Sequence, residues 1–526
     1  MIAPFGDCAL LVQVGDYRRA HALLAALDRE PIAGVVDLVP GMETVVVELD
    51  SPSRVGVVGA ELERRLAALR PEGASGRERF IPTAYGGDFG PDLEEVARLT
   101  GLRSAEVVSM HAGSVLRVQL VGFAPGFAYI GDLPQALQVP RLETPRTTTP
   151  PGSVAVAGRQ TGIYPAPLPG GWRILGRTPI TLFDPRRSPP AYLAPGDVVR
   201  FGVLPATEWD AHTGIPADWA QDIVTEPRPS RPSGVEIEVL DGGLLTSVQD
   251  AVGRHGWHRY GVQAAGTLDR SAAVLANRLA GNPDAAAVLE ITLLGPGLRL
   301  SEPARVGLAG ADLGAMLDGK PLAPGSSGIG RLVSFGERRS GARAYLAIAG
   351  GLDVNPVLGS PSTDLRSGFG GFGGRALRTG DQLQLGSASG GLPAGSGRRP
   401  TGPIRILSGP YLERFAPGAL GRLCQTRWTV SSEADRMGYR LDGPAIEHDG
   451  APETPSVGLP LGAVQVPPDG RPIVMLADRP VTGGYPVIAC VAAADVDRVA
   501  QLLPGEPIRF ALPGSQGDAA WAGALE

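Results

Sequence analysis

The chain has 526 residues, which is too long for a single hydrophobic core, so we expect roughly three or four domains. Hydrophobic residues make up 43% of it, and 74 Gly with 50 Pro favour turn-rich β architecture over helical bundles. The formal net charge of −6 argues against a nucleic-acid partner, because binding a phosphate backbone needs clustered cations.

The rare residue types narrow the possible classes of protein further. Lys320 is the only lysine and is followed by Pro321, which excludes a phosphate-binding loop ending in Gly-Lys-Ser or Gly-Lys-Thr. The three cysteines, Cys8, Cys424 and Cys490, lie far apart without metal-ligand spacing, which favours a reduced, cytoplasmic compartment. The N-terminus lacks the pattern of a signal peptide, and no apolar run is long enough to predict a membrane span.

Residues 1–78 are predicted to form a small α/β domain. Apolar residues in strand patterns predict a strand over 9–14 and a hairpin over 35–49. Apolar residues at helical spacing predict amphipathic helices over 17–29 and 57–69. The pattern changes after this unit, where strands and glycine turns begin to dominate.

Residues 79–205 are expected to form a second, β-rich domain. Two short helices are predicted, one over 93–100 that ends at Gly101 and one over 105–111 with Ser104 as its N-cap. Beyond them, short strands alternate with Gly and Pro turns. This pattern indicates a barrel-like core.

The amino-acid composition predicts two linkers in the remainder of the chain. A Pro-rich segment, 206–234, is typical of a stiff linker, and a segment rich in Gly, Ser and Ala, 388–402, is typical of a flexible one. They delimit a third part, 235–387, with a clear helix over 270–280, and a fourth part, 403–514. The fold class predicted for the whole chain is α+β and β-rich, with a small α/β domain at the N-terminus.

A Gly- and Pro-rich run over 122–129 follows a predicted strand and carries three aromatic residues. A stiff loop at a strand end is a common way to present a binding surface. Its rings could bind a small planar ligand, or they could form a packed aromatic corner. The three are Phe123, Phe127 and Tyr129.

A second run over 158–165 carries amide and hydroxyl groups. Gln160, Thr161 and Tyr164 suit a polar, uncharged substrate such as an amide, although such groups also stabilise turns. His111 precedes the strand that leads to the first run. It is a candidate general base, with a histidine buried in the core or lying on the surface as the alternative.

Two other runs match ligand-binding patterns only formally. His255 and His258 have ligand-capable spacing, but a third ligand and a regular helix are missing, so no metal site is expected. The glycines of 368–373 fit a dinucleotide-binding pattern without the helix that should follow it. That segment is expected to be a loop.

The second half contains repeated acid–base couples near glycine turns. They could be surface ion pairs, or they could stabilise a developing oxyanion or a phosphoryl group. The couples are Gln249-Asp250 with Arg254, Asp435-Arg436, Asp469 and Asp478-Arg479. Two further turn-rich runs, 465–470 and 482–486, contribute Gln465 and Tyr485. We expect the two halves to fold back so that their loops face one shared cleft.

Several motifs of the first half resemble the allophanate hydrolase subunit 1 family, which includes the B subunit of 5-oxoprolinase and a bacterial sporulation-kinase inhibitor. They are 120–129, 144–146, 158–165 and 171–178. Motifs of the second half resemble the subunit 2 family, which includes the C subunit of 5-oxoprolinase. They are 244–250, 266–269, 289–292, 308–312, 435–438 and 465–486.

The resemblance implies a natural fusion of the B and C subunits with cyclophilin-like β-barrel domains. It also implies ATP-dependent opening of 5-oxo-L-proline to L-glutamate together with a separate protein similar to the A subunit of 5-oxoprolinase. ATP, with Mg, would be bound jointly with that protein, and no biotin would be attached. Because a five-membered lactam recloses easily, phosphorylation of its amide oxygen would drive the opening, and this step needs cationic clamps and oriented donors.

These expectations assign roles to particular side chains. The candidate catalytic residues are His111, Arg146, Arg177, Arg436 and Arg479. The candidate substrate contacts are Phe123, Phe127, Tyr129, Gln160, Thr161, Tyr164, Gln249, Asp250, Gln465, Asp469 and Tyr485.

Two alternative functions from other classes remain. The same paired domains form the carboxyltransferase part of urea carboxylase, which would require a separate biotin carrier, because the chain has no Met-Lys-Met attachment site. A regulatory protein that inhibits a histidine kinase through the first half is the third possibility.

Overall fold

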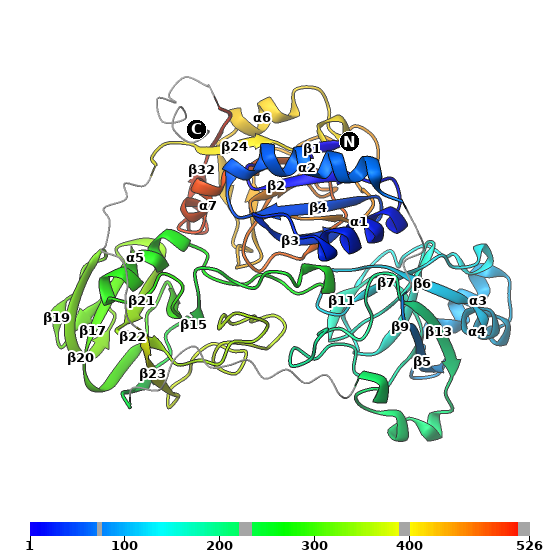
Figure 1. Ribbon diagram of the computed structural model, residues 1–526, viewed down its shortest axis with the longest axis horizontal. Coiled ribbons are helices and arrows are strands. Elements are labelled where there is room, and N and C mark those ends of the chain that lie inside the picture. The colour runs from blue at the N-terminus through cyan, green and yellow to red at the C-terminus, as the bar shows by residue number, and fades with distance from the viewer. Residues whose placement is uncertain (71–75, 220–233, 389–399, 514–526) are drawn as a thin grey trace.

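The computed structural model describes residues 1–70, 76–219, 234–388 and 400–513. Figure 1 shows the N-terminal domain (blue) against the yellow-to-red C-terminal part, above a green sheet on the left and a cyan barrel on the right. Parts of both expected linkers, 220–233 and 389–399, lie outside the described residues. The domain limits expected from the sequence therefore stay a prediction.

The N-terminal domain is an antiparallel sheet in the order β1-β2-β4-β3, with two helices on one face. The side chains of β2 and β4 alternate between two cores, so the run Val45-Val46-Val47 is buried on both faces of the sheet. The elements are β1 (Ile2–Pro4), β2 (Ala9–Gln13), α1 (Tyr17–Arg29), β3 (Val35–Pro40), β4 (Thr44–Leu49) and α2 (Val55–Ala68).

The next part of the chain closes into a seven-stranded barrel in the order β10-β7-β6-β13-β5-β12-β9. Closure depends on a parallel pairing of β13 with β5, two strands far apart in the sequence. The strands are β5 (Glu78–Tyr85), β6 (Val115–Val121), β7 (Ala128–Gly131), β9 (Ser153–Ala157), β10 (Gln160–Ile163), β12 (Arg173–Arg177) and β13 (Val198–Val203). A small side sheet pairs β8 (Arg146–Thr149) with β11 (Leu168–Gly170).

The two helices expected next to this barrel are α3 (Leu93–Thr100) and α4 (Ser104–Gly113). As expected, α3 ends at Gly101 in the left-handed conformation. The expectation for α4 was wrong by one residue, because Arg103 is the N-cap and Ser104 already belongs to the helix. The backbone N–H of Arg103 donates to the Glu106 carboxylate at 2.8 Å, which fixes the start of the helix there.

The second half contains a ten-stranded sheet packed against helix α5 (Arg270–Ala280). Asp269 caps this helix by accepting from the backbone N–H of Ala272, and Gly281 ends it. The strands are β14 (Glu236–Asp241), β15 (Leu245–Gln249), β16 (Val288–Thr292), β17 (Gly297–Asp312), β18 (Met316–Leu317), β19 (Lys320–Pro321), β20 (Ser326–Ser334), β21 (Ser340–Ile348), β22 (Gly350–Leu352) and β23 (Gln382–Ala388).

An eight-stranded sheet follows, in the order β32-β25-β26-β29-β28-β31-β24-β33, and β27 (Val457–Gly458) pairs with β30 (Thr482–Gly483) beside it. Its elements are β24 (Ile404–Ser408), α6 (Ala419–Gln425), β25 (Trp428–Val430), β26 (Gly438–Asp442), β28 (Ala463–Gln465), β29 (Ile473–Met475), β31 (Val487–Val491), α7 (Ala493–Val499), β32 (Pro507–Ile508) and β33 (Phe510–Ala511). The strand-rich α+β fold class with barrel-like sheets is thus confirmed.

One hydrophobic core is shared by the two ends of the chain. The face of the N-terminal sheet opposite its helices packs against the C-terminal part, so the chain folds back on itself (Figure 1). The core comprises Phe5, Ala9, Leu11, Val39 and Val46 from the first segment and Val457, Leu459, Ala463, Met475, Val481, Val487 and Cys490 from the last.

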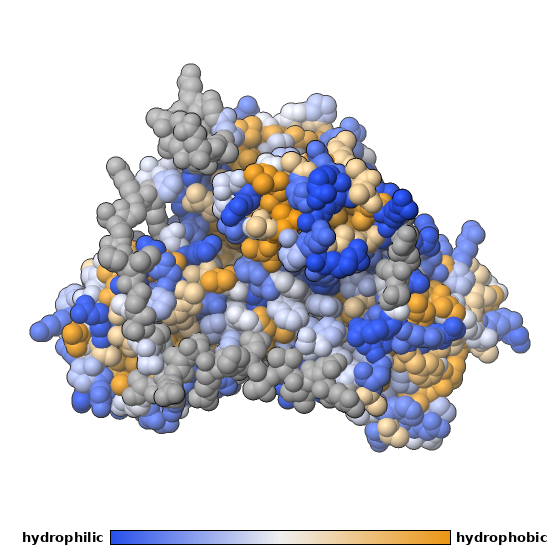
Figure 2. All heavy atoms as spheres, viewed as in Figure 1, coloured by the Kyte–Doolittle hydropathy of each residue, from blue (hydrophilic) through white to orange (hydrophobic). Residues whose placement is uncertain are grey.

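On the face seen in Figure 2, apolar side chains gather over the N-terminal domain and over the barrel at the lower right, among hydrophilic ones. Exposed apolar residues of these two parts include Val57, Phe80 and Val203. Scattered apolar side chains of this kind are ordinary on protein surfaces. None of the helices in the described ranges is long and apolar enough to cross a membrane.

The shared core leads to a test of the contact between the two ends. A Cβ atom added at Gly458 would lie 2.7 Å from Val39 Cβ and 3.0 Å from Val46 Cβ. Gly458→Ala should therefore lower the free energy of unfolding by about 1–3 kcal/mol, measured by denaturant unfolding. Gly421→Ala in α6, where a Cβ meets nothing within 4 Å, is the control and should leave stability unchanged or raise it. Equal effects of both variants would contradict this packing.

Candidate functional site

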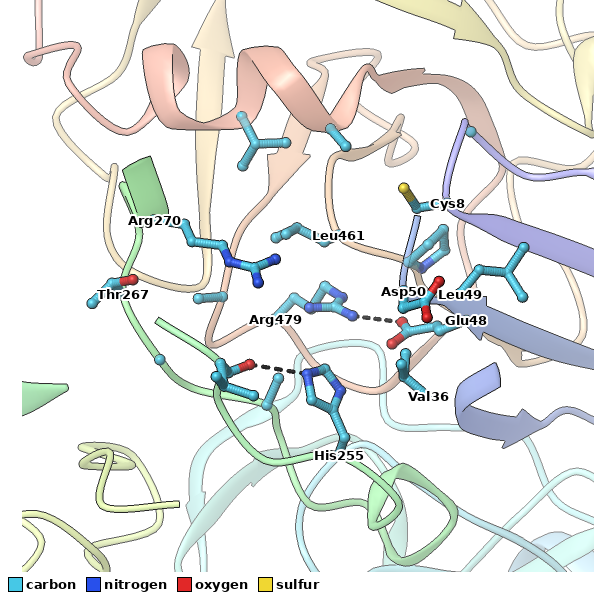
Figure 3. A pocket seen from close by; sticks show the side chains of 18 of the residues that line it. Cys8, Val36, Glu48, Leu49, Asp50, His255, Thr267, Arg270, Leu461 and Arg479 are labelled. Carbon is cyan, nitrogen blue, oxygen red and sulfur yellow. Dashed lines mark hydrogen bonds and ion pairs between the residues drawn. The ribbon is translucent and has the colours of Figure 1, made fainter. Parts of the chain in front are cut away.

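A cavity of about 540 Å³ lies where three parts of the chain meet. Its walls come from the N-terminal sheet and the loop between β1 and β2, from segment 251–270, and from the C-terminal part with helix α7. Figure 3 shows Arg270 and Thr267 on one side, Cys8, Asp50 and Glu48 on the other, and Arg479 between them. Both halves of the chain thus contribute to one cavity.

Two acidic residues lie at the edge of this cavity because of strand register. Asp37 on β3 is directly opposite Glu48 on β4, and both point toward the second half, as Val39 and Val46 do. Like charges placed opposite each other on neighbouring strands are destabilising. Cations from elsewhere must therefore compensate for them.

His258 and Arg479 supply this compensation. Arg479 Nη2 donates to Glu48 Oε1 at 2.7 Å, and its Nε donates to the Leu459 carbonyl at 2.7 Å. His258 Nδ1 lies 3.3 Å from Asp37 Oδ2 and 3.4 Å from Glu48 Oε2. All four side chains are buried. We call Asp37, Glu48, His258 and Arg479 the interdomain charge cluster.

The protonation states in this cluster follow from burial and charge together. Burial alone would lower the pKa of His258, but the carboxylates of Asp37 and Glu48 raise it above its ordinary value. Burial alone would raise the pKa of Glu48, but His258 and Arg479 hold it well below its ordinary value. For Asp37, burial outweighs the attraction of His258 and raises the pKa. The cluster therefore favours a protonated imidazole beside an ionised Glu48.

Arg436 belongs to a second buried ionic group next to the cavity. It donates to both oxygens of Asp478, at 2.8 and 2.9 Å, and to Glu290. Its Nη2 also donates to the carbonyl of Gly266, which lines the cavity, at 2.7 Å. Arg436 thus holds a wall of the cavity without lining it.

The loops singled out in the two halves touch each other away from the cavity. The backbone N–H of Phe123 donates to Thr482 Oγ1 at 3.2 Å, and Arg366 lies over the Phe123 ring at 5.8 Å. Phe127 is buried and packs edge-on against the Phe123 ring and against three further rings. These rings are Tyr129, Tyr164 and Trp172.

His111 lies inside the first barrel, far from solvent. Its Nδ1 is 2.8 Å from the Tyr85 hydroxyl and its Nε2 is 3.0 Å from Thr161 Oγ1. Burial lowers the pKa of His111 to about 3, so the imidazole is neutral near pH 7. Gln160, on the same strand as Thr161, donates to Gln119 at 2.7 Å.

The other candidate residues of the first half are held by local partners. Arg146 donates to Asp92 at 2.6 Å, and Arg177 donates to the Pro151 carbonyl at 3.0 Å. Neither residue lines the cavity.

The remaining candidates of the second half also have partners in the protein. Asp250 is buried and accepts from Ser360 and Ser362, and Gln249 donates to Ser247 and to the carbonyl of Thr363. Gln465 donates to the Tyr485 carbonyl, while Asp469 binds Arg471 and Arg440 near the surface. Of all the candidate residues, Arg479 alone is among those that line the cavity within the described ranges.

Sequence reasoning missed several residues that line the cavity. They include Cys8, Asp50, His255, Thr267 and Arg270. Arg270 directly follows the motif 266–269, so that motif was the available signal. No sequence pattern connects Cys8 or Asp50 to this motif, because both residues come from another domain. Within the described ranges, no group of three or more His, Cys, Asp or Glu residues could hold a metal ion.

Comparison with known proteins matches each half separately. Residues 1–193 match the family model described as carboxyltransferase domain, subdomain C and D, and residues 260–512 match the one described as subdomain A and B. The chain is 39% identical over 280 residues to the C subunit of 5-oxoprolinase from Escherichia coli strain K12, covering 52% of this chain and 90% of that protein. It is 34% identical over 229 residues to the B subunit of 5-oxoprolinase from Bacillus subtilis strain 168, covering 40% and 95%.

The whole chain also resembles a solved structure, that of the protein TTHA0988. The TM-score is 0.82 at 37% sequence identity, and the alignment covers 97% of this chain and 100% of the other. The arrangement of the two halves is therefore shared by another single chain.

The interdomain charge cluster leads to a second test. Glu48→Gln should lower the free energy of unfolding by about 3–5 kcal/mol, because it leaves Arg479 and His258 buried without their shared anion. Asp50→Asn is the control, since Asp50 is partly exposed and only 3.6 Å from the exposed Arg54, and should change stability by less than about 1 kcal/mol. Similar losses for both variants in denaturant unfolding would refute the role of the cluster.

The neutral His111 predicts a pH dependence of stability. Its folded pKa, about 3, lies below the ordinary value of 6.5, so only the unfolded chain takes up this proton between those values. Its contribution to stability is therefore present above about pH 6.5 and is lost by about 1.4 kcal/mol per pH unit as the pH falls. His111→Gln should flatten the fall in melting temperature between pH 6.5 and 4.5. An unchanged slope would contradict a buried neutral imidazole.

Proposed function

We propose that the chain forms the B and C components of a 5-oxoprolinase. It belongs to the carboxyltransferase-domain family and is a fusion of homologues of the B and C subunits of 5-oxoprolinase. Together with a separate A component it would open 5-oxo-L-proline to L-glutamate in a reaction driven by ATP. The proposal rests on both halves covering nearly the full length of their relatives.

The single structural observation that supports this proposal is the cavity between the halves. Its volume of about 540 Å³ is in the usual range for small-molecule sites. Glu48 and Asp50 come from the half that resembles the B component, whereas Thr267, Arg270 and Arg479 come from the half that resembles the C component. A site of this composition requires both components, which fits a reaction that needs B and C together.

The proposed chemistry uses ATP to make an amide carbon reactive. The terminal phosphoryl group goes to the lactam oxygen, water adds to the carbon, and the ring nitrogen leaves as an amine that takes up a proton. Hydrolysis of the resulting acyl phosphate releases phosphate. Charge develops on oxygen atoms in these steps, and fixed guanidinium groups such as that of Arg479 can stabilise it.

The ATP site is proposed to be shared with the A component. The only lysine, Lys320, precedes Pro321, so the chain cannot form a phosphate-binding loop of the Gly-Lys-Ser type. Mg²⁺ would accompany the nucleotide there. The side chains of this chain would bind and orient the lactam and exclude water from it.

A carboxyltransferase is the second candidate, because both matching family models carry that description. It would transfer a carboxyl group from biotin on a separate carrier protein. Recovery of a biotinylated partner on streptavidin together with this chain would favour this alternative.

The proposed activity predicts a simple reconstitution result. The full chain mixed with a homologue of the A component should release glutamate from 5-oxo-L-proline, with phosphate released in step, only when ATP is present. Neither protein alone should do so. Glutamate can be measured by coupled dehydrogenase assay and phosphate by colorimetry. Full activity of the isolated A component, or no activity of the mixture, would contradict the proposal.

A further inference from the structure

Arg270 lies on one wall of the cavity, and Asp50 lies on the opposite wall. We propose that it binds a small ligand through a free carboxylate, with the guanidinium of Arg270 as counter-ion and an N–H group of the ligand directed toward Asp50. Figure 3 shows Arg270 reaching toward the middle of the cavity and Asp50 on the opposite side. The choice of 5-oxo-L-proline as that ligand rests on the proposed function.

Among the basic residues that line the cavity, Arg270 is the one whose charged group has no partner in the part of the chain that the structure describes. Three basic side chains line the cavity. Arg479 is bound to Glu48 and Leu459, and His255 Nε2 lies 2.9 Å from the Val252 carbonyl. Within the described ranges, the Arg270 guanidinium has no ion pair or hydrogen bond, so it can accept an anionic ligand without breaking a contact.

The acidic neighbour from helix α7 does not neutralise Arg270. Asp497 accepts from the backbone N–H groups of Arg270 and Ser271, at 3.0 and 3.1 Å, and from the Ser271 hydroxyl. These bonds hold its carboxylate at the backbone of the first turn of α5. They also hold the backbone of Arg270 in place. Asp269 stabilises the same turn by capping the helix.

The residues that line the cavity suit a small, partly apolar ligand that carries a carboxylate. A guanidinium can bind both carboxylate oxygens at once, which a lysine cannot match in geometry. Phe5, Pro460 and Leu461 supply apolar surface between the charged walls. Asp50 is partly exposed and has only a 3.6 Å contact with Arg54, so its oxygens can accept from a ligand N–H.

The direct test is binding to the full chain in the absence of the A component, measured by isothermal titration calorimetry. The probes are 5-oxo-L-proline and 2-pyrrolidinone, which is the same lactam without the carboxylate. The wild type should bind 5-oxo-L-proline about 10- to 100-fold more tightly than 2-pyrrolidinone, as expected for a charge-assisted hydrogen bond. Arg270→Gln should remove that preference, and Arg270→Lys should keep part of it.

Arg278→Gln is the matched control, because Arg278 lies on the same helix and binds Asp284 on the surface. It should leave the preference unchanged. Absence of 5-oxo-L-proline binding to the wild type, or an equal preference in Arg270→Gln, would overturn the inference.

Kinetics of the complex with the A component separate this inference from the proposed function. Arg270→Gln should raise KM for 5-oxo-L-proline about 10- to 100-fold and change kcat less. An active complex with an unchanged KM would overturn the inference and leave the function standing. Carboxylate-dependent binding without any ATP-dependent activity would support the inference and refute the function.

Discussion

The arrangement of this protein depends on a buried ionic contact between its first 50 residues and its second half. Asp37 and Glu48 lie opposite each other on adjacent strands, and neither could stay ionised there without the cations that face them. His258 and Arg479 come from two different segments, so both must dock for the acids to be compensated. Apolar packing around Val46 stabilises the contact but does not fix its geometry. The four ionisable side chains fix how the two parts are positioned, because they must face one another.

The cavity is a consequence of this docking. Glu48 and Arg479 are at once part of the ionic contact and part of the cavity wall, so the geometry of the space is tied to the geometry of the interface. Arg436 also stabilises a wall of the cavity, because it binds Asp478, Glu290 and the Gly266 carbonyl. Glu48, Arg479 and the wall at Gly266 are therefore held in place by buried charged groups.

Local structure could be predicted well from the sequence, and the site could not. Helical spacing located α1, and Asp269 and Gly281 marked the ends of α5, because caps act within one turn of the helix they limit. Barrel closure by β13 and β5, and the docking of Val46 onto the C-terminal sheet, join residues far apart in the sequence, and no local pattern encodes them. Of the candidate residues, Arg479 lines the cavity. Arg270 has the sequence pattern of an ordinary helix residue, and only the structure places it across the cavity from Asp50 of another domain.

The core shared by the two ends of the chain has a consequence for assembly. In relatives that are encoded as two proteins, the corresponding surfaces must find each other from solution. Here the segment that carries Phe5 and Leu11 belongs to the same chain as the one that carries Val457 and Val487, so their encounter is intramolecular. The ratio of the two components is fixed at synthesis, and dilution does not separate them.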